Sequence, residues 1–144
     1  MEASPKALAA QNEKVPATIV SKKTLYKGYK NYTIALKNKL NNAVVTYKSS
    51  DKLVATVSAK GVVKPVNKGR AVITVNISQA GRKYTSKIDI TVMHPYFELI
   101  NETNEVMLGS TFTFKGKGYG MGKDDWEWRS SDDSIVTIEK NPVY

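Results

Sequence analysis

The sequence of 144 residues predicts an all-β protein folded as an antiparallel β-sandwich, and three observations indicate this. Apolar and polar residues alternate with a period of two in several segments, as in strands with one buried and one wet face. Turn-forming residues separate these segments at short intervals. No segment shows a sustained helical repeat of apolar residues.

The alternating segments carry β-branched and aromatic residues, which suit a pleated sheet surface. They lie at residues 32–37, 45–48, 71–77 and 87–92. The turn signals between the segments are Lys27-Gly28, Asn41-Asn42, Ser49-Ser50-Asp51, Lys60-Gly61, Asn67-Lys68-Gly69 and Ala80-Gly81. About seven short strands at this spacing predict a sandwich. The last strand should end before His94-Pro95, because proline cannot donate a ladder hydrogen bond.

An internal repeat divides the chain. Residues 48–57 (KSSDKLVATV) resemble residues 129–138 (RSSDDSIVTI) at a constant offset of 81. In the first copy, strand-forming segments follow this motif, and they have no counterpart before Tyr144. We therefore expect a tail at 1–14, a complete domain at 15–93 and the N-terminal part of a second, truncated domain at 94–144. Half a sandwich leaves open edges, so the second unit should be less stable than the first or should pack on a neighbour.

The ordered motifs of the first unit allow a family comparison. They are LYKG at 25–28, VTYKSSD at 45–51, VATVS at 54–58, KGVV at 60–63, KGRAVITV at 68–75 and IDITV at 88–92. The first unit resembles the bacterial immunoglobulin-like domains of group 2. The second unit matches at 106–109 and 128–132, but lacks the later strands and has an unusual glycine-rich insert at 116–122.

The resemblance implies an immunoglobulin-like β-sandwich. Such domains occur in tandem in secreted and surface-attached bacterial proteins, including adhesins and accessory regions of large enzymes, and in phage tail and capsid proteins. The resemblance also implies that the shared motifs are mainly structural. The glycines supply turn conformations, and Ser49, Ser50 and Asp51 hydrogen-bond the local backbone where the chain changes direction.

Composition excludes several classes of site. Without cysteine there are no disulfides, cysteine zinc sites or thiol nucleophiles. No segment approaches the roughly 18 apolar residues that span a membrane, so we expect no membrane insertion. The start of the chain lacks the features of a signal peptide. If the protein is exported, as an extracellular or cell-surface location requires, the signal was removed.

Catalysis has little support, and we expect no catalytic residues, no cofactor and no metal site. The only histidine, His94, stands beside a proline at the boundary between the units. The segment 116–120 superficially suggests a phosphate cradle, but it lacks the Gly-Lys-Ser/Thr ending and is better interpreted as a hairpin loop. The aspartate pairs at 124–125 and 132–133 fit exposed turns better than a Ca²⁺ site, since their spacing matches no EF-hand loop.

Charge gives the main functional indication. Residues 15–93 contain 15 Lys and Arg against two acids, a net +13, whereas residues 94–144 carry −4. Predicted outward positions and turns hold a candidate polyanion-binding set: Lys37, Lys48, Lys64, Arg70, Arg82, Lys83 and Lys87. The polyanions found outside a bacterium are teichoic acids, anionic glycans and acidic host surfaces. A solubilising face that protects strand edges is the alternative.

Trp126 and Trp128 are a second candidate site. They lie two residues apart, so in a strand both point to the same face. At the repeat offset they correspond to Val45 and Tyr47, which favours the core. The alternative is an exposed stacking platform for a sugar or a protein partner.

The sequence therefore predicts a non-catalytic extracellular or cell-surface module. It would act as an adhesion or spacer domain, with anionic glycans bound through the basic face. The alternatives are an accessory domain of a secreted carbohydrate-active enzyme and a phage virion decoration domain. The expected partners are a cell-surface glycan, a host or cell-wall protein, and neighbouring immunoglobulin-like repeats. Nucleic acid is not expected, because no aromatic stacking series or recognition helix is present.

Overall fold

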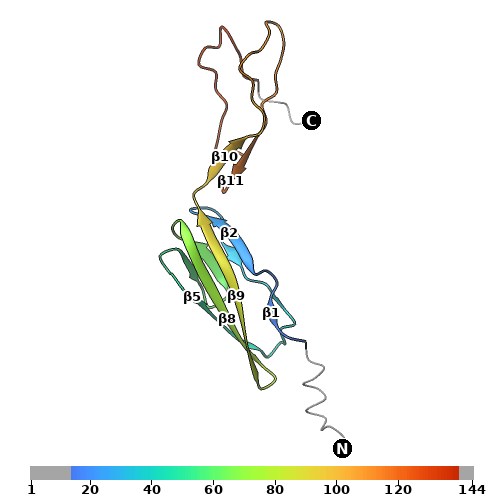
Figure 1. The fold of residues 1–144 in the computed structure, drawn as a ribbon, viewed down its shortest axis with the longest axis vertical. Helices are drawn as coiled ribbons and strands as arrows, with labels where there is room; N and C mark the ends of the chain where they lie inside the picture. The colour runs from blue at the N-terminus through green and yellow to red at the C-terminus, as the bar shows by residue number, and fades with distance from the viewer. Residues whose placement is uncertain (1–13, 140–144) are drawn as a thin grey trace, which may run out of the picture.

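The computed structural model describes residues 14–139, and these form strands, turns and loops without a helix. The all-β, immunoglobulin-like fold class is therefore confirmed. Figure 1 shows a sandwich followed by a narrower region that extends beyond its end. The predicted tail lies outside the described residues except for Lys14.

The sandwich contains nine strands in three sheets. The four-stranded sheet has the order β2-β9-β8-β5, the three-stranded sheet has the order β3-β7-β6, and β1 pairs with β4. The strands are β1 (Ala17–Thr18), β2 (Lys22–Tyr26), β3 (Tyr32–Thr33), β4 (Leu36–Lys37), β5 (Val44–Ser49), β6 (Ala55–Val57), β7 (Val62–Pro65), β8 (Gly69–Gln79) and β9 (Arg82–Met93). As predicted, β9 ends immediately before His94-Pro95.

Alternate residues of the two longest strands form the core. Ile73, Val75 and Ile77 on β8, with Ile88 and Ile90 on β9, are almost completely buried. These β-branched side chains fill the space between the sheets, and removal of their apolar surface from water is the main stabilising contribution. The intervening residues of the same strands therefore face outward, on the far side of the four-stranded sheet.

One strand pair departs from the predicted antiparallel arrangement. Every pair in the described residues is antiparallel except β2–β9, which is parallel. The N-terminal segment first pairs through β1 with β4 and then, after residues 19–21, joins the other sheet as β2. There it runs in the same direction as β9 and covers the free edge of that strand (Figure 1).

The Ser-Ser-Asp motif at the end of β5 makes the predicted local hydrogen bonds through Ser49 and Asp51, whereas Ser50 bonds to a distant strand. The Ser49 hydroxyl donates to the Ala55 carbonyl oxygen (2.6 Å), and the Leu53 amide donates to Asp51 Oδ1 (2.9 Å). Ser50 extends the sheet beyond β5, because its Oγ accepts from the Val72 amide (2.8 Å) and its amide donates to the Val72 carbonyl oxygen (2.9 Å). The motif therefore ties the end of β5 to β6 and β8.

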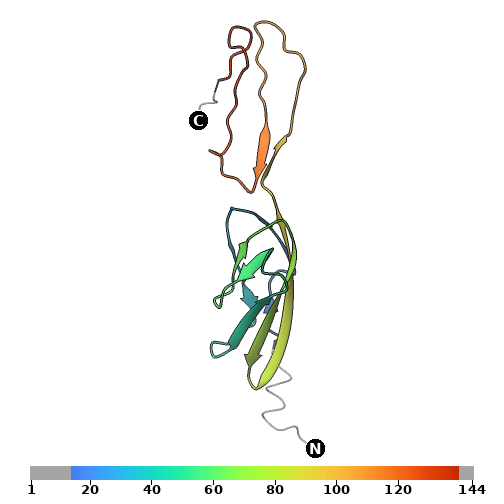
Figure 2. The same ribbon diagram turned by 90° about the vertical axis from the view of Figure 1, so that its left-hand side faces the viewer.

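The region after His94-Pro95 contains one hairpin in the described residues. Strands β10 (Tyr96–Leu99) and β11 (Gly116–Tyr119) pair antiparallel, and the remaining residues to 139 form loops and turns (Figure 2). Its large apolar side chains are exposed, among them Met107 (80%), Leu108 (104%) and Ile135 (77%). No second sheet covers them within the described residues, so this region has no core like that of residues 15–93.

Residues Gly116–Tyr119 of the glycine-rich insert form strand β11, so the interpretation of this part as a hairpin loop was wrong. Three of its glycines lie where side chains press against the backbone. A Cβ on Gly116 would collide with the Phe97 ring, one on Gly118 with Met121 and Trp126, and one on Gly120 with Tyr26. Glycine in a strand permits this close approach. The missing side chains are therefore a packing requirement of the β10–β11 hairpin.

Candidate polyanion-binding face

The outer face of the four-stranded sheet gathers basic residues from separate parts of the chain. On β8, Arg70, Val72 and Thr74 alternate with the buried core residues and point outward. On β9, the exposed residues Lys87 and Asp89 do the same. The long β8–β9 hairpin pairs without interruption from Gly69↔Val92 to Gln79↔Arg82, which fixes these side chains in register.

Strand register sets which outward side chains are neighbours. Thr74 pairs with Lys48 of β5 on one side and with Lys87 of β9 on the other. The two lysines therefore flank one threonine, roughly 10 Å apart at ordinary strand spacing. Lys83 lies on the same face nearer the hairpin tip, opposite Ser78.

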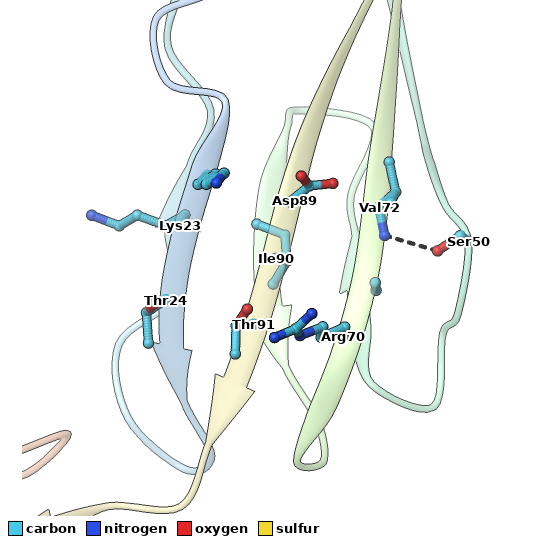
Figure 3. Close-up of a pocket in the computed structure, with 10 residues that line it drawn as sticks. Lys23, Thr24, Ser50, Arg70, Val72, Asp89, Ile90 and Thr91 are labelled. Atoms are coloured by element: carbon cyan, nitrogen blue, oxygen red, sulfur yellow. Dashed lines mark hydrogen bonds between the residues drawn. The ribbon is translucent and has the colours of Figure 1, made fainter.

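A shallow groove of about 440 Å³ lies at the other end of this face, over β2, β9 and β8 (Figure 3). Its lining residues are Lys22, Lys23, Thr24, Ser50, Arg70, Ala71, Val72, Asp89, Ile90 and Thr91. Register places Thr24 beside Thr91 and Thr91 beside Arg70. Two residues further along these strands, the next row of outward-facing side chains is Lys22, Asp89 and Val72.

The structure brings together part of the predicted basic set. Lys48, Arg70, Lys83 and Lys87 share the outer face of the four-stranded sheet. Arg82 lies at the tip of the β8–β9 hairpin.

Two members of the set lie elsewhere. Lys37 is on β4, paired with Ala17 of β1, and Lys64 is on β7 of the three-stranded sheet. Alternation identified both as outward positions but could not assign them to a sheet. The role of the whole set in polyanion binding stays a prediction.

The sequence did not single out the groove residues Lys22, Thr24, Asp89 and Thr91 as a group. They meet because β2 adds to the sheet parallel to β9. Nothing in an alternating pattern specifies that pairing, since period two reports a buried face and not a partner strand. The proximity of β2 and β9 therefore had no signal in this single sequence.

Trp126 and Trp128 join an aromatic cluster, but they do not lie in the strand that the repeat predicted. Both rings contact Phe97, with centroid distances of 5.3 and 5.8 Å. Trp126 is half-buried and Trp128 is 39% exposed, so neither lies in a closed core. Trp128 also stacks on Phe114 at 5.5 Å. In the first unit β5 is held extended by its six-residue pairing with β8. Residues 126–130 have no such neighbour among the described residues, so they form a loop.

The remaining candidates from the sequence have local roles. Asp125 Oδ2 accepts from the Gly122 amide, and Asp132 Oδ1 accepts from the amide (2.9 Å) and hydroxyl (2.6 Å) of Ser134. These two bonds to Ser134 lower the pKa of Asp132, because they stabilise the charged carboxylate. Within residues 14–139 there is no group of three or more His, Cys, Asp or Glu that suits a metal ion. His94 is exposed between β9 and β10.

Residues 13–88 match the family described as bacterial Ig-like domain, group 2. This chain belongs to that family. Domains of the bacterial Ig-like family are generally non-catalytic modules. In residues 14–139 no helix has the length and apolar character needed to cross a membrane.

Relatives of this bacterial Ig-like chain include an enzyme. A segment of 64 residues, 43% of the chain, is 45% identical to the kappa-carrageenase of Pseudoalteromonas carrageenovora, of which it covers 16%. Solved structures with a similar fold include an EHEC O157:H7 intimin mutant (17% identity, TM-score 0.36, covering 54% of this chain and 39% of that one). Domains 5–6 of the S-layer protein SbsC are also similar (15% identity, TM-score 0.42, covering 76% and 62%).

Proposed function

We propose that this chain is a non-catalytic module of a secreted or surface-exposed bacterial protein, and that it binds anionic glycans through the outer face of its four-stranded sheet. One observation carries the proposal. That face presents five cations and a single acid, Asp89. The cations are Lys22, Lys48, Arg70, Lys83 and Lys87. Such a concentration of one charge attracts polyanions and raises their local concentration.

The geometry of the face suits an extended polymer. Neighbouring strands are about 4.8 Å apart, and outward residues along a strand are about 6.7 Å apart. Strand pairing therefore spaces the cations regularly along an exposed surface. A chain molecule with repeated charges can contact several of them at once, which multiplies weak individual attractions.

The carrageenase relationship favours a parent protein that acts on polysaccharide. The matched segment is 16% of that enzyme's length, a size that fits an accessory region. In this form of the proposal, the module would hold an anionic polysaccharide near a catalytic domain. The sheet face would contribute attachment and the other domain the chemistry.

A spacer or adhesion role is the second candidate, and the arrangement of the two regions favours it. Only His94 and Pro95 separate β9 from β10, and the Tyr26 and Tyr96 rings meet across this junction at 6.4 Å. The two regions therefore follow one another end to end (Figure 1). A short linker with a packed aromatic contact limits bending, as a stalk requires.

Affinity electrophoresis through gels that contain dextran sulfate, with neutral dextran as the comparison, tests the glycan proposal. The double variant Lys48→Glu/Lys87→Glu should lose about tenfold or more in affinity, since two cations of the array become repulsive. The control Lys37→Glu/Lys64→Glu changes the net charge by the same amount away from the face and should change affinity by about twofold at most. Equal losses in both variants, or no retardation of the native chain at low salt, would exclude the face as the site.

A further inference from the structure

The groove over β2, β9 and β8 has a chemistry different from the rest of the basic face. Register sets the acid Asp89 beside Lys22 and sets Arg70 beside Thr91. Figure 3 shows the Asp89 carboxylate and the Arg70 side chain on the same side of the sheet, with Arg70 reaching toward β9. The Lys23 side chain extends away from β9 in the same view, and its Nζ lies 5.0 Å from the centre of the Tyr32 ring.

Asp89 is not explained as a structural ion pair. The one ion pair within 4 Å among residues 14–139 joins Arg129 and Glu127. The carboxylate of Asp89 therefore does not hold Lys22, Lys87 or Arg70 in place, although all three lie on the same face. It is one of only two acids among residues 15–93, and it is exposed at the groove.

The groove has one apolar side chain next to these polar groups. Val72 lies beside Asp89 in the same row. Its amide and carbonyl are both bonded to Ser50, at 2.8 and 2.9 Å, which extends the sheet to that point (Figure 3). The backbone at Val72 is therefore paired on the side toward β5. Cationic side chains, a hydrogen-bond acceptor and a small apolar surface lie within two residues of one another along the strands.

We propose that this groove recognises a sugar unit that carries both an anionic substituent and a free hydroxyl. This inference rests on the proposed glycan-binding function and names the ligand chemistry of its most specific part. Lys22 and Arg70 bind a sulfate or carboxylate oxygen, Asp89 accepts a hydrogen bond from a ring hydroxyl, and the C–H face of the sugar packs on Val72.

The acid is the informative residue. A polyanion without hydroxyl groups is only repelled by Asp89. A sugar hydroxyl donates to the carboxylate in a charge-assisted hydrogen bond, which is about twice as strong as a neutral one. Arg70 suits the anion, because its guanidinium presents paired donors to the oxygens of a sulfate or carboxylate. The same acid therefore opposes one class of polymer and favours the other.

The variant Asp89→Val separates the two classes by the sign of its effect. Valine suits an exposed strand position and removes both the charge and the acceptor. Binding by the full chain is measured by isothermal titration with carrageenan, polygalacturonate and inorganic polyphosphate. Affinity for at least one of the two glycans should fall about tenfold, whereas affinity for polyphosphate should rise about twofold. Circular dichroism confirms the fold, and Thr46→Val on the same sheet face is the matched control.

The other outcomes decide separately on the two proposals. If Asp89→Val strengthens binding of all three polymers, the acid only repels, and the inference fails while the basic face remains. A weakening for all three polymers also overturns it, because Asp89 would then act through the sheet rather than through a hydroxyl. If the native chain binds none of them, the glycan-binding function itself is wrong. The carrageenan and polygalacturonate arms show whether sulfate or carboxylate is preferred.

Discussion

The same turn occurs twice in this molecule, in surroundings that differ completely. In the first region the Leu53 amide bonds to Asp51 Oδ1 at 2.9 Å, and 81 residues later the Ser134 amide bonds to Asp132 Oδ1 at 2.9 Å. The next two amides in each copy bond to the same aspartate's carbonyl oxygen at 3.1–3.2 Å. Sequence-local hydrogen bonds therefore form this turn without help from a core.

Burial, by contrast, depends on distant strands. Val54 is 9% exposed and Ala55 is fully buried, whereas their counterparts Ile135 and Val136 are 77% and 47% exposed. In the first region β8 supplies the cover. A Cβ on Gly69 would lie 2.9 Å from the Val54 side chain, so the β8 backbone presses directly on it. The comparison shows that the motif specifies a turn. Burial of the residues that follow the turn requires the later strands, which cover them in the first region.

The largest expected consequence is that the two regions unfold separately. Both tryptophans lie in the second region, so tryptophan fluorescence excited selectively over tyrosine reports that region alone. Far-UV circular dichroism reports mainly the strands of residues 15–93. For a domain of that length we expect a free energy of unfolding of about 4–12 kcal/mol. The uncovered second region should have less than about 2 kcal/mol, by its lack of buried surface. The fluorescence transition should therefore come at lower urea, and coincident transitions would show that the regions fold as one unit.

A matched pair of core truncations sharpens the same contrast. Ile73→Ala on β8 removes a fully buried side chain and should lower the free energy of unfolding by about 2–5 kcal/mol. Ile135→Ala removes the same atoms from a site that is 77% exposed and should change it by less than about 0.5 kcal/mol. Urea midpoints from circular dichroism measure the effect of Ile73→Ala on the first region, and midpoints from tryptophan fluorescence measure the effect of Ile135→Ala on the second. A comparable loss in the two variants would mean that Ile135 is covered in solution.

Serine substitutions test whether the turn depends on the cover above it. Ser49 is buried, and its hydroxyl donates to the Ala55 carbonyl oxygen at 2.6 Å, so Ser49→Ala leaves that acceptor unsatisfied and should cost about 1–3 kcal/mol. Ser130, its counterpart, accepts from the Asp132 amide at 3.2 Å at a half-buried site. Ser130→Ala should cost less than about 0.5 kcal/mol. Chemical denaturation of both variants, with Ser131→Ala as a neutral reference, checks the ratio.

The strands and turns of the first region were predictable because their causes are local. Alternating β-branched residues specify a strand with one buried face, as at Ile73 and Val75. The turn glycines have the positive φ angles that other residues resist, 74° at Gly28 and 79° at Gly61. Periodicity gave the correct outward positions on β8 and β9, including Arg70 and Lys87.

The features that the sequence did not predict depend on pairing between distant segments. The parallel β2–β9 contact and the groove of Lys22 and Asp89 require a register that alternation does not encode. The strand at Gly116–Tyr119 was mistaken for a loop because glycine usually weakens strands. Here it forms where Phe97 and Trp126 take the place of its missing side chains. Sequence reasoning therefore identified the charge of the candidate site but not the arrangement that would give it selectivity.

The smallest predicted difference between the two copies of the turn arises from one hydroxyl. Ser134 stands where the first copy has Leu53, and its hydroxyl and amide both donate to Asp132 Oδ1, at 2.6 and 2.9 Å. These bonds hold the pKa of Asp132 below the ordinary aspartate value of 3.8. The ionised carboxylate therefore stabilises the folded turn fully at pH values above the pKa of Asp132 in the unfolded chain. This stabilisation is lost as the pH falls through the lower pKa of the folded state. Titration of the carboxyl carbon by NMR should give a midpoint under 3.8.

The variant Ser134→Leu installs the residue of the first copy and should raise that midpoint, while Ser131→Ala should leave it unchanged. An unaltered midpoint in Ser134→Leu would mean that the hydroxyl does not bond the carboxylate in solution. Because Asp132 is fully exposed, solvent screens the interaction, and the change should appear in the titration of this one group before it appears in the unfolding of the chain. The second copy of the motif has no covering sheet. Titration of Asp132 should therefore not change the stability of residues 15–93.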